Sequence, residues 1–168
     1  LITQNSLDSS FNPTFRLYKE PVSKILYLVV NPVAHDSNRF ITPNSVDEIT
    51  INNTRLHVNF YKSALYVYLM ASTYVIRENL PIVITGYLIG GSIATSLDFI
   101  FRTQTSVETL LVTFSAIPAL SNYTLDDSHI YGIYQEHDFT HLLSAPIILN
   151  TLQQDNEMTM FLTPLALK

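Results

Sequence analysis

The sequence contains no cysteine, which excludes a disulfide framework, a thiol nucleophile and a cysteine-based metal site. Charged residues make up only 14% of the chain, against about 25% in ordinary soluble domains. No run of basic residues occurs and the formal net charge is −5, which argues against a nucleic-acid-binding surface. The longest apolar stretch, near residues 82–101, is interrupted by glycine, serine, threonine and Asp98. It is therefore not the apolar span of about 20 residues that a transmembrane helix needs.

The 168 residues, of which 47% are apolar, predict one folded domain. Residues 1–24 are polar, contain Pro13 and Pro21, and are expected to form a leading segment that is partly irregular. Residues 25–168 are expected to form the domain itself. Because the chain begins with Leu1 and shows no targeting segment, we expect a processed form or an excerpt, which leaves open whether the domain is truncated at its C-terminus.

Four short apolar runs rich in β-branched residues predict buried strands, at residues 25–30, 82–85, 110–114 and 130–134. Residues 157–162 are a weaker fifth candidate. A polar loop is expected over 35–53. Apolar residues at helical spacing then predict a long helix over 56–78 and a second helix that starts at Ile89. Strands that alternate with helices indicate an α/β fold with a mostly parallel sheet.

Three of the four glycines lie within six residues, between the predicted strand 82–85 and the following helix. Glycine is needed where the backbone turns too sharply for a Cβ, or where a helix and a strand approach closely. The simplest interpretation is a tight turn. The spacing of Gly86 and Gly90 also fits the nucleophile elbow G-x-S-x-G, but Leu88 stands where that motif has its serine, and a leucine cannot attack a carbonyl.

A nucleotide-binding turn is the competing interpretation of the same residues. It is disfavoured because Ser92 stands at the last glycine position of the dinucleotide pattern and no acidic residue closes a following strand about 20 residues on. A P-loop is disfavoured because no lysine follows the glycines. No cofactor is therefore expected.

Four segments, in the right order, resemble the class 3 (fungal-type) lipase family. Residues 81–94 are similar to its strand, V-T-G-H-S-L-G-G-A-L-A turn and helix. The other three are 55–60, similar to K-V-H-x-G-F; 112–122, similar to T-F-G-x-P-R-V-G-N; and 138–143, similar to D-x-V-P-x-L-P. The resemblance covers about residues 25–145 and implies an α/β-hydrolase-like fold, with a mostly parallel central sheet and flanking helices.

The departures from the family pattern bear on catalysis. Leu88 replaces the nucleophile, Tyr87 replaces the preceding histidine, and residues 31–34 replace the family's R-G-T oxyanion-hole segment. Asp138 alone matches a triad position, and no histidine follows His141. The resemblance thus implies a degenerate member, and some plant immune-signalling lipase-like proteins that lack the serine act by forming heterodimers. Losing serine and histidine together leaves at most residual activity, because the triad acts as a unit.

The function that we expect from the sequence is non-catalytic association, as a scaffold or signalling protein, with a protein partner or a second copy. One alternative is an ester or lipid hydrolase with a non-standard nucleophile, for which Ser92 and Ser115 are weak candidates because neither has an identified base. The other alternative is binding of a lipid or small apolar ligand in the former acyl pocket. The residues expected to line that pocket are Leu88, Ile89, Asn31 and Phe139.

An interface of more than about 1,200 Å² is expected on the aromatic helix 56–78 or on the loops near Leu88 and Phe139. The helix residues proposed for this interface are Phe60, Tyr61 and Tyr68. The alternative for these side chains is packing in the core of the domain. No metal site is expected, because histidines four apart on a loop at a strand end converge poorly on one ion. The candidate metal ligands in this part of the sequence are His129, Glu136, His137, Asp138 and His141.

Overall fold

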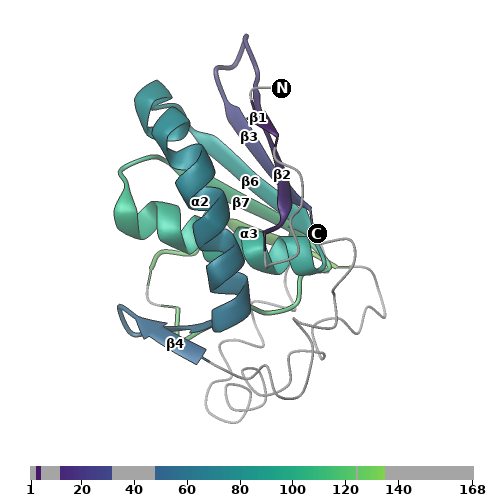
Figure 1. Cartoon of the computed structure of the whole chain (residues 1–168), viewed down its shortest axis with the longest axis vertical. Coiled ribbons are helices and arrows are strands. Elements are labelled where there is room, and N and C mark those ends of the chain that lie inside the picture. The colour runs from purple at the N-terminus through teal and green to yellow at the C-terminus, as the bar shows by residue number, and fades with distance from the viewer. Residues whose placement is uncertain (1–2, 5–11, 32–47, 124, 135–168) are drawn as a thin grey trace.

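The computed structural model describes residues 3–4, 12–31, 48–123 and 125–134, and the account below concerns these residues (Figure 1). They form two helices and nine strands. In chain order these are β1 (Thr3–Gln4), β2 (Thr14–Lys19), β3 (Leu26–Asn31), β4 (Glu48–Ile51), β5 (Thr54–His57), α2 (Val58–Glu78), β6 (Ile82–Tyr87), α3 (Ile89–Gln104), β7 (Thr109–Phe114), β8 (Leu120–Ser121) and β9 (Ile130–Ile133).

The main sheet has six strands in the order β1-β2-β3-β6-β7-β9. β3, β6, β7 and β9 run parallel, whereas β1 and β2 are antiparallel additions at one edge. A small antiparallel sheet, β4-β5-β8, lies apart from it. The predicted α/β fold with a mostly parallel central sheet is confirmed, and its four parallel strands lie where the apolar runs placed them.

One local feature adds to the expectations and another differs from them. Within the leading segment, β2 buries Phe15 and Leu17 on the sheet, because its alternating residues place every second side chain in the core. The expected loop contains β4, and the first residues of the expected helix instead form β5, which pairs with β8. The fifth strand candidate, 157–162, lies outside the described residues.

The helix α2 begins and ends through identifiable caps. At its start, the Nδ1 atom of His57 accepts a hydrogen bond from the Asn59 N–H at 3.3 Å, which satisfies one of the free donors of the first turn. At its end, Asn79 adopts a left-handed conformation (φ 47°, ψ 45°) and donates its N–H to the Val75 carbonyl at 3.0 Å. One face of the helix is fully buried and carries Phe60, Ala64, Val67, Ala71 and Val75.

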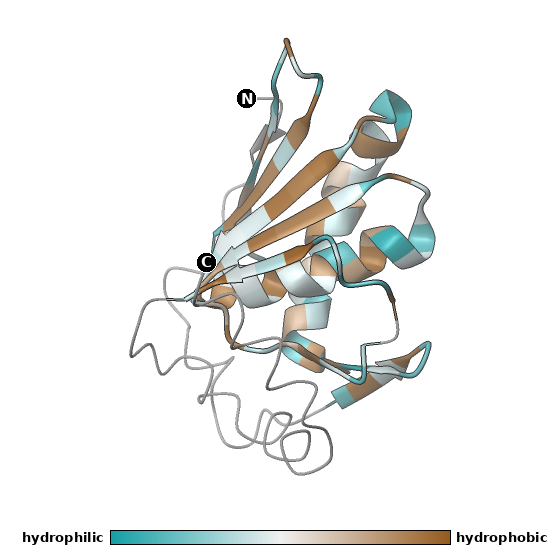
Figure 2. Ribbon diagram, turned by 180° about the vertical axis from the view of Figure 1, so that it is seen from behind, coloured by the Kyte–Doolittle hydropathy of each residue, from teal (hydrophilic) through white to brown (hydrophobic). Residues whose placement is uncertain are grey.

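Both helices lie on the same face of the main sheet, in front of it in Figure 1, and Figure 2 shows the strands from the opposite side with no described helix over them. The steps from β3 to β6 and from β6 to β7 run in the same direction across the sheet. Since parallel crossovers are right-handed, successive steps in one direction place their helices on one face. The core accordingly forms between this face and the helices, around Leu28, Ile84, Ile93 and Leu111.

The close approach of α3 to β6 explains the clustered glycines. A Cβ on Gly86 would lie 2.3 Å from the carbonyl oxygen of Gly90, and a Cβ on Gly91 would lie 2.8 Å from the Cβ of Ala116. The first of these obstacles is backbone, which cannot rotate away. The strand and the helix can therefore pack at this distance only with glycine at position 86.

We predict that Gly86→Ala lowers the free energy of unfolding by at least about 2 kcal/mol, because the added methyl forces strand and helix apart. Gly132→Ala is the matched control, since its Cβ would meet only the movable ring of Tyr134, at 3.0 Å, and should cost less than about 1 kcal/mol. Urea unfolding of both variants measures the difference. Equal losses would contradict the role given to the contact between Gly86 and Gly90.

Candidate functional site

The turn between β6 and α3 has the backbone geometry of a nucleophile elbow. Leu88 is the single residue between the strand and the helix, with φ 50° and ψ −120°, a region that L-residues rarely occupy. Its N–H donates to the carbonyl of Phe114 at 3.0 Å, and its own carbonyl accepts from the Ser92 N–H at 3.1 Å. The expectation that Leu88 stands at a strained apex is confirmed. The apex side chain is an alkyl group that can neither attack a carbonyl nor donate a proton.

The two serines considered as displaced nucleophiles both lie near the elbow, where the hydroxyl of Ser92 and the backbone of Ser115 make structural contacts. Ser92 is fully buried, and its Oγ atom lies 2.5 Å from the Ile117 carbonyl oxygen and 3.3 Å from that of Leu88. Its hydroxyl therefore fastens α3 to the segment after β7. Ser115 has φ 49° and donates its N–H to the Ile133 carbonyl at 2.8 Å, which joins β7 to β9.

Two histidines lie within the described residues, and both side chains make structural contacts. The Nδ1 atom of His57 caps α2, and His129 lies directly before β9 with its Nε2 atom against Asp98 of α3. Neither of these contacts involves Leu88. His137, His141, Glu136 and the triad-position residue Asp138 lie outside the described residues.

Three of the four residues expected to line an acyl pocket meet at one edge of the sheet. Val30 pairs with Gly86, so Asn31 at the end of β3 lies beside the strand that leads to Leu88. Asn31 is exposed, Leu88 is partly exposed and Ile89 is buried. Phe139 lies outside the described residues.

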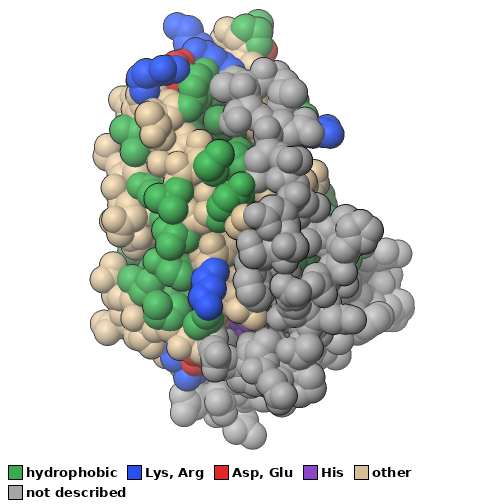
Figure 3. All heavy atoms as spheres, in the orientation of Figure 1, with side chains coloured by type: hydrophobic (Ala, Val, Ile, Leu, Met, Phe, Trp, Pro, Cys, Tyr) green, Lys and Arg blue, Asp and Glu red, His purple; other side chains and the backbone are tan. Residues whose placement is uncertain are grey.

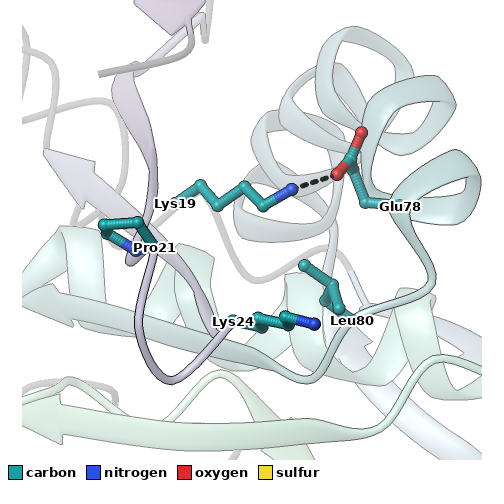
Figure 4. Close-up of a pocket in the computed structure, with 5 residues that line it drawn as sticks. All are labelled: Lys19, Pro21, Lys24, Glu78 and Leu80. Atoms are coloured by element: carbon teal, nitrogen blue, oxygen red, sulfur yellow. Dashed lines mark hydrogen bonds and ion pairs between the residues drawn. The ribbon is translucent and has the colours of Figure 1, made fainter.

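A surface depression lies at the other end of the strands and is lined by Lys19, Pro21, Lys24, Glu78 and Leu80 (Figure 4). Across it the Lys19 ammonium and the Glu78 carboxylate form an ion pair at 2.5 Å. This hydrogen bond raises the pKa of Lys19 and lowers the pKa of Glu78. The depression borders the start of β3 and the end of α2, so it is distinct from the elbow and is not the expected acyl pocket.

The helix residues proposed for an interface differ in their surroundings. Phe60 is 1% exposed and its ring lies 4.5 Å from that of His57, so it packs in the core instead of facing a partner. Tyr61 and Tyr68 are partly buried, and Tyr68 packs edge-on against Phe101 at 5.0 Å. Burial of Phe60 follows from its place on the apolar stripe of α2, one turn before Ala64.

A buried polar cluster that the sequence analysis did not find joins α3 to the start of β9. Asp98 is only 1% exposed. The Oδ2 atom of its carboxylate lies 3.0 Å from the Nε2 atom of His129, whereas the Oδ1 atom of Asp98 has no hydrogen-bond partner. Arg102, one turn further along α3, donates to the Tyr123 hydroxyl at 3.1 Å and to the Asp126 carbonyl, and lies about as close to both ring nitrogens of His129.

The electrostatics of this cluster suit a structural contact. Burial, followed by the negative charge of Asp98, raises the pKa of Tyr123 to about 12, and Arg102 partly opposes both effects. The pair of Asp98 and His129 resembles two members of a hydrolase triad in chemistry only. Asp98 lies nine positions after Ile89 on α3, which corresponds to about 14 Å along the helix axis. The only signal in the sequence was a charged residue inside an apolar helix.

Comparison with solved structures shows which fold this arrangement belongs to. The lipase of Rhizomucor miehei matches with a TM-score of 0.68 and 17% identity over 86% of this chain and 60% of that one. Lip2 lipase of Yarrowia lipolytica matches with a TM-score of 0.65 and 15% identity over 85% of this chain and 60% of that one. The lipase of Rhizopus microsporus var. chinensis matches with a TM-score of 0.62 and 13% identity over 79% of this chain and 51% of that one.

The chain has a lipase-like α/β-hydrolase fold. It spans about three fifths or less of the length of these three lipases. No protein-family model matches the sequence, and no curated protein matches it. At such identities the likeness establishes the lipase-like fold, and the chemistry has to be argued from the residues of this chain.

Two further observations concern the described residues alone. Neither of their helices is both long enough and apolar enough to cross a membrane. Within the same residues, no group of three or more histidine, aspartate or glutamate side chains is arranged to hold a metal ion.

We predict that Leu88→Gly leaves the lipase-like fold more stable than Leu88→Ala by about 1 kcal/mol, because only glycine adopts φ 50° without strain. The exposed helical position Thr73 is the control, where glycine should be the less stable choice by about 1 kcal/mol. Thermal unfolding of the four variants checks this reversal of sign. The same order of stability at both positions would mean that the apex is not strained.

We predict that Asp98→Ala lowers the free energy of unfolding by about 3 kcal/mol, because it leaves His129 without its buried carboxylate partner. Glu78→Ala, which breaks the more exposed ion pair with Lys19, should cost much less. A double-mutant cycle with His129→Ala should give a coupling of at least about 1 kcal/mol. Additive losses would show that the two side chains do not interact.

Proposed function

We propose that this lipase-like domain does not hydrolyse esters at its elbow and that it works through association with protein. The absence of ester hydrolysis is argued from the leucine at the apex, which has the backbone conformation that would present a nucleophile. Catalysis by this fold depends on a hydroxyl at that point, activated by a base and opposed by oxyanion donors. In this role the elbow only connects β6 to α3.

The second half of the proposal rests on exposed apolar surface. Within the described residues, eleven large hydrophobic side chains are at least 36% exposed. Only 14% of the chain is charged, so little charge separates them. Large apolar patches on the surface of a soluble domain mark contacts with other molecules.

The first test is hydrolysis of short-chain p-nitrophenyl esters by the purified chain. We expect turnover at the level of the uncatalysed reaction, and no gain from Leu88→Ser, because a serine alone restores only one member of a triad that acts as a unit. Leu88→Ala is the matched control, since it shortens the same side chain without adding a hydroxyl.

Two outcomes would contradict the proposal. Turnover of the unmodified chain that is lost in Ser115→Ala would identify a displaced nucleophile. Turnover by Leu88→Ser but not by Leu88→Ala would show that a base is present at the elbow. Mass spectrometry of the purified chain checks the remaining alternative, because a stoichiometric lipid would favour ligand binding over association with protein.

A further inference from the structure

Exposed apolar side chains gather on the face of the main sheet that no described helix covers. We call this surface the open sheet face; it is brown along β3, β6 and β7 in Figure 2. Six of its side chains are 36–57% exposed. They are Tyr27 of β3, Tyr87 of β6, Leu110 and Phe114 of β7, and Tyr131 and Ile133 of β9.

The register of the strands arranges these side chains in rows. Tyr27 pairs with Val83 and Val83 with Leu110, which forms one row. Tyr87 pairs with Phe114 and Phe114 with Ile133, which forms another row nearer the elbow. Partners in register point to the same side, and their neighbours along each strand, such as Ile84 and Leu111, point into the core. The open sheet face is thus one continuous surface.

Charge is nearly absent from this surface. On β3, β6, β7 and β9 every residue of the open sheet face is uncharged, and the charged residue that β2 contributes to it is Arg16, which pairs with Val29. Parallel strands in the middle of a sheet are normally covered on both faces, because their residues are apolar on both. A face of this composition favours contact with another apolar face.

A second apolar surface lies on α2, where Leu69, Met70 and Ile76 are exposed on the helix side of the molecule, which Figure 3 displays. It is the weaker candidate, since it has three large side chains and is flanked by the exposed cations Lys62 and Arg77. It provides a matched control for substitutions on the sheet.

We infer that the open sheet face binds the same face of a second copy of this chain, an inference that rests on the proposed role in association. A broad surface about 19 Å across, from five neighbouring strands about 4.8 Å apart, fits another sheet better than a small ligand, which needs a concave pocket. In a two-fold dimer the uncharged strands β3, β6, β7 and β9 bring no like charges together, and Arg16 lies towards the β2 side of the face.

The area is sufficient for such a dimer. With about 200 Å² for each fully exposed large side chain, the six exposed residues supply about 500 Å² per copy. Their partly buried neighbours Val29, Val83 and Val112 raise the total for two copies to about 1,200 Å², the lower end of stable specific interfaces. The two sheets would pack about 10 Å apart.

Sedimentation equilibrium of the full chain tests the inference. We expect a dimer, and an increase of at least about 100-fold in its dissociation constant for Leu110→Glu and for Tyr131→Glu, because each copy would bring a carboxylate to the interface. Leu69→Glu on α2 should leave the constant unchanged. A monomer at all concentrations, or a dimer that only Leu69→Glu weakens, would overturn the inference.

A second measurement covers the case in which a charged variant fails to fold. Since the chain has no cysteine, single variants Tyr27→Cys, Leu110→Cys and Leu69→Cys give unambiguous attachment points for a bismaleimide about 10 Å long, matched to the sheet spacing. Cross-linked dimers are expected from at least one of the two sheet variants and not from Leu69→Cys. Cross-linking from neither sheet variant overturns the inference.

These experiments separate two kinds of failure. If the chain is strictly monomeric and has no esterase activity, the sheet-to-sheet dimer is excluded but the non-catalytic proposal is not. A dimer that hydrolyses esters keeps the interface and removes the non-catalytic proposal.

Discussion

The packing of α3 against β6 determines most of what is distinctive in this molecule. Gly86 lets the first turn of the helix come so close that a methyl group on this residue would overlap the carbonyl of Gly90. That approach leaves a single residue, Leu88, to reverse the chain, and it does so only in a backbone conformation that costs free energy. The hydroxyl of Ser92 then fastens the helix to the segment after β7.

Keeping a strained apex without a nucleophile has a simple physical explanation. The backbone conformation follows from the close packing of helix and strand, so it persists whatever side chain stands at the apex, and every residue except glycine is strained there. A leucine there carries no group that can attack a carbonyl or transfer a proton. The site therefore has the backbone of a nucleophile elbow with an alkyl side chain at its apex.

The direction of the crossovers has an equally large effect on the surface. Since β3, β6 and β7 follow one another in a single direction, both described helices lie on one face and the open sheet face lies on the other. The first face contains the core, and the cluster of Asp98, Arg102 and His129 anchors its far end. The second face is apolar and uncharged in its centre, which makes it the strongest candidate for contact with another molecule.

The sequence by itself determined the four parallel strands, both helices and the elbow, because apolar periodicity and clustered glycines report directly on local backbone geometry. It missed β2, whose buried Phe15 and Leu17 lie between two prolines in a polar segment. It also missed the pairing of Asp98 with His129, which are 31 residues apart. Only the tertiary structure placed Phe60 in the core and put both described helices on one face of the sheet. A side chain's exposure depends on which elements lie over it, and periodicity along one strand or helix does not contain that information.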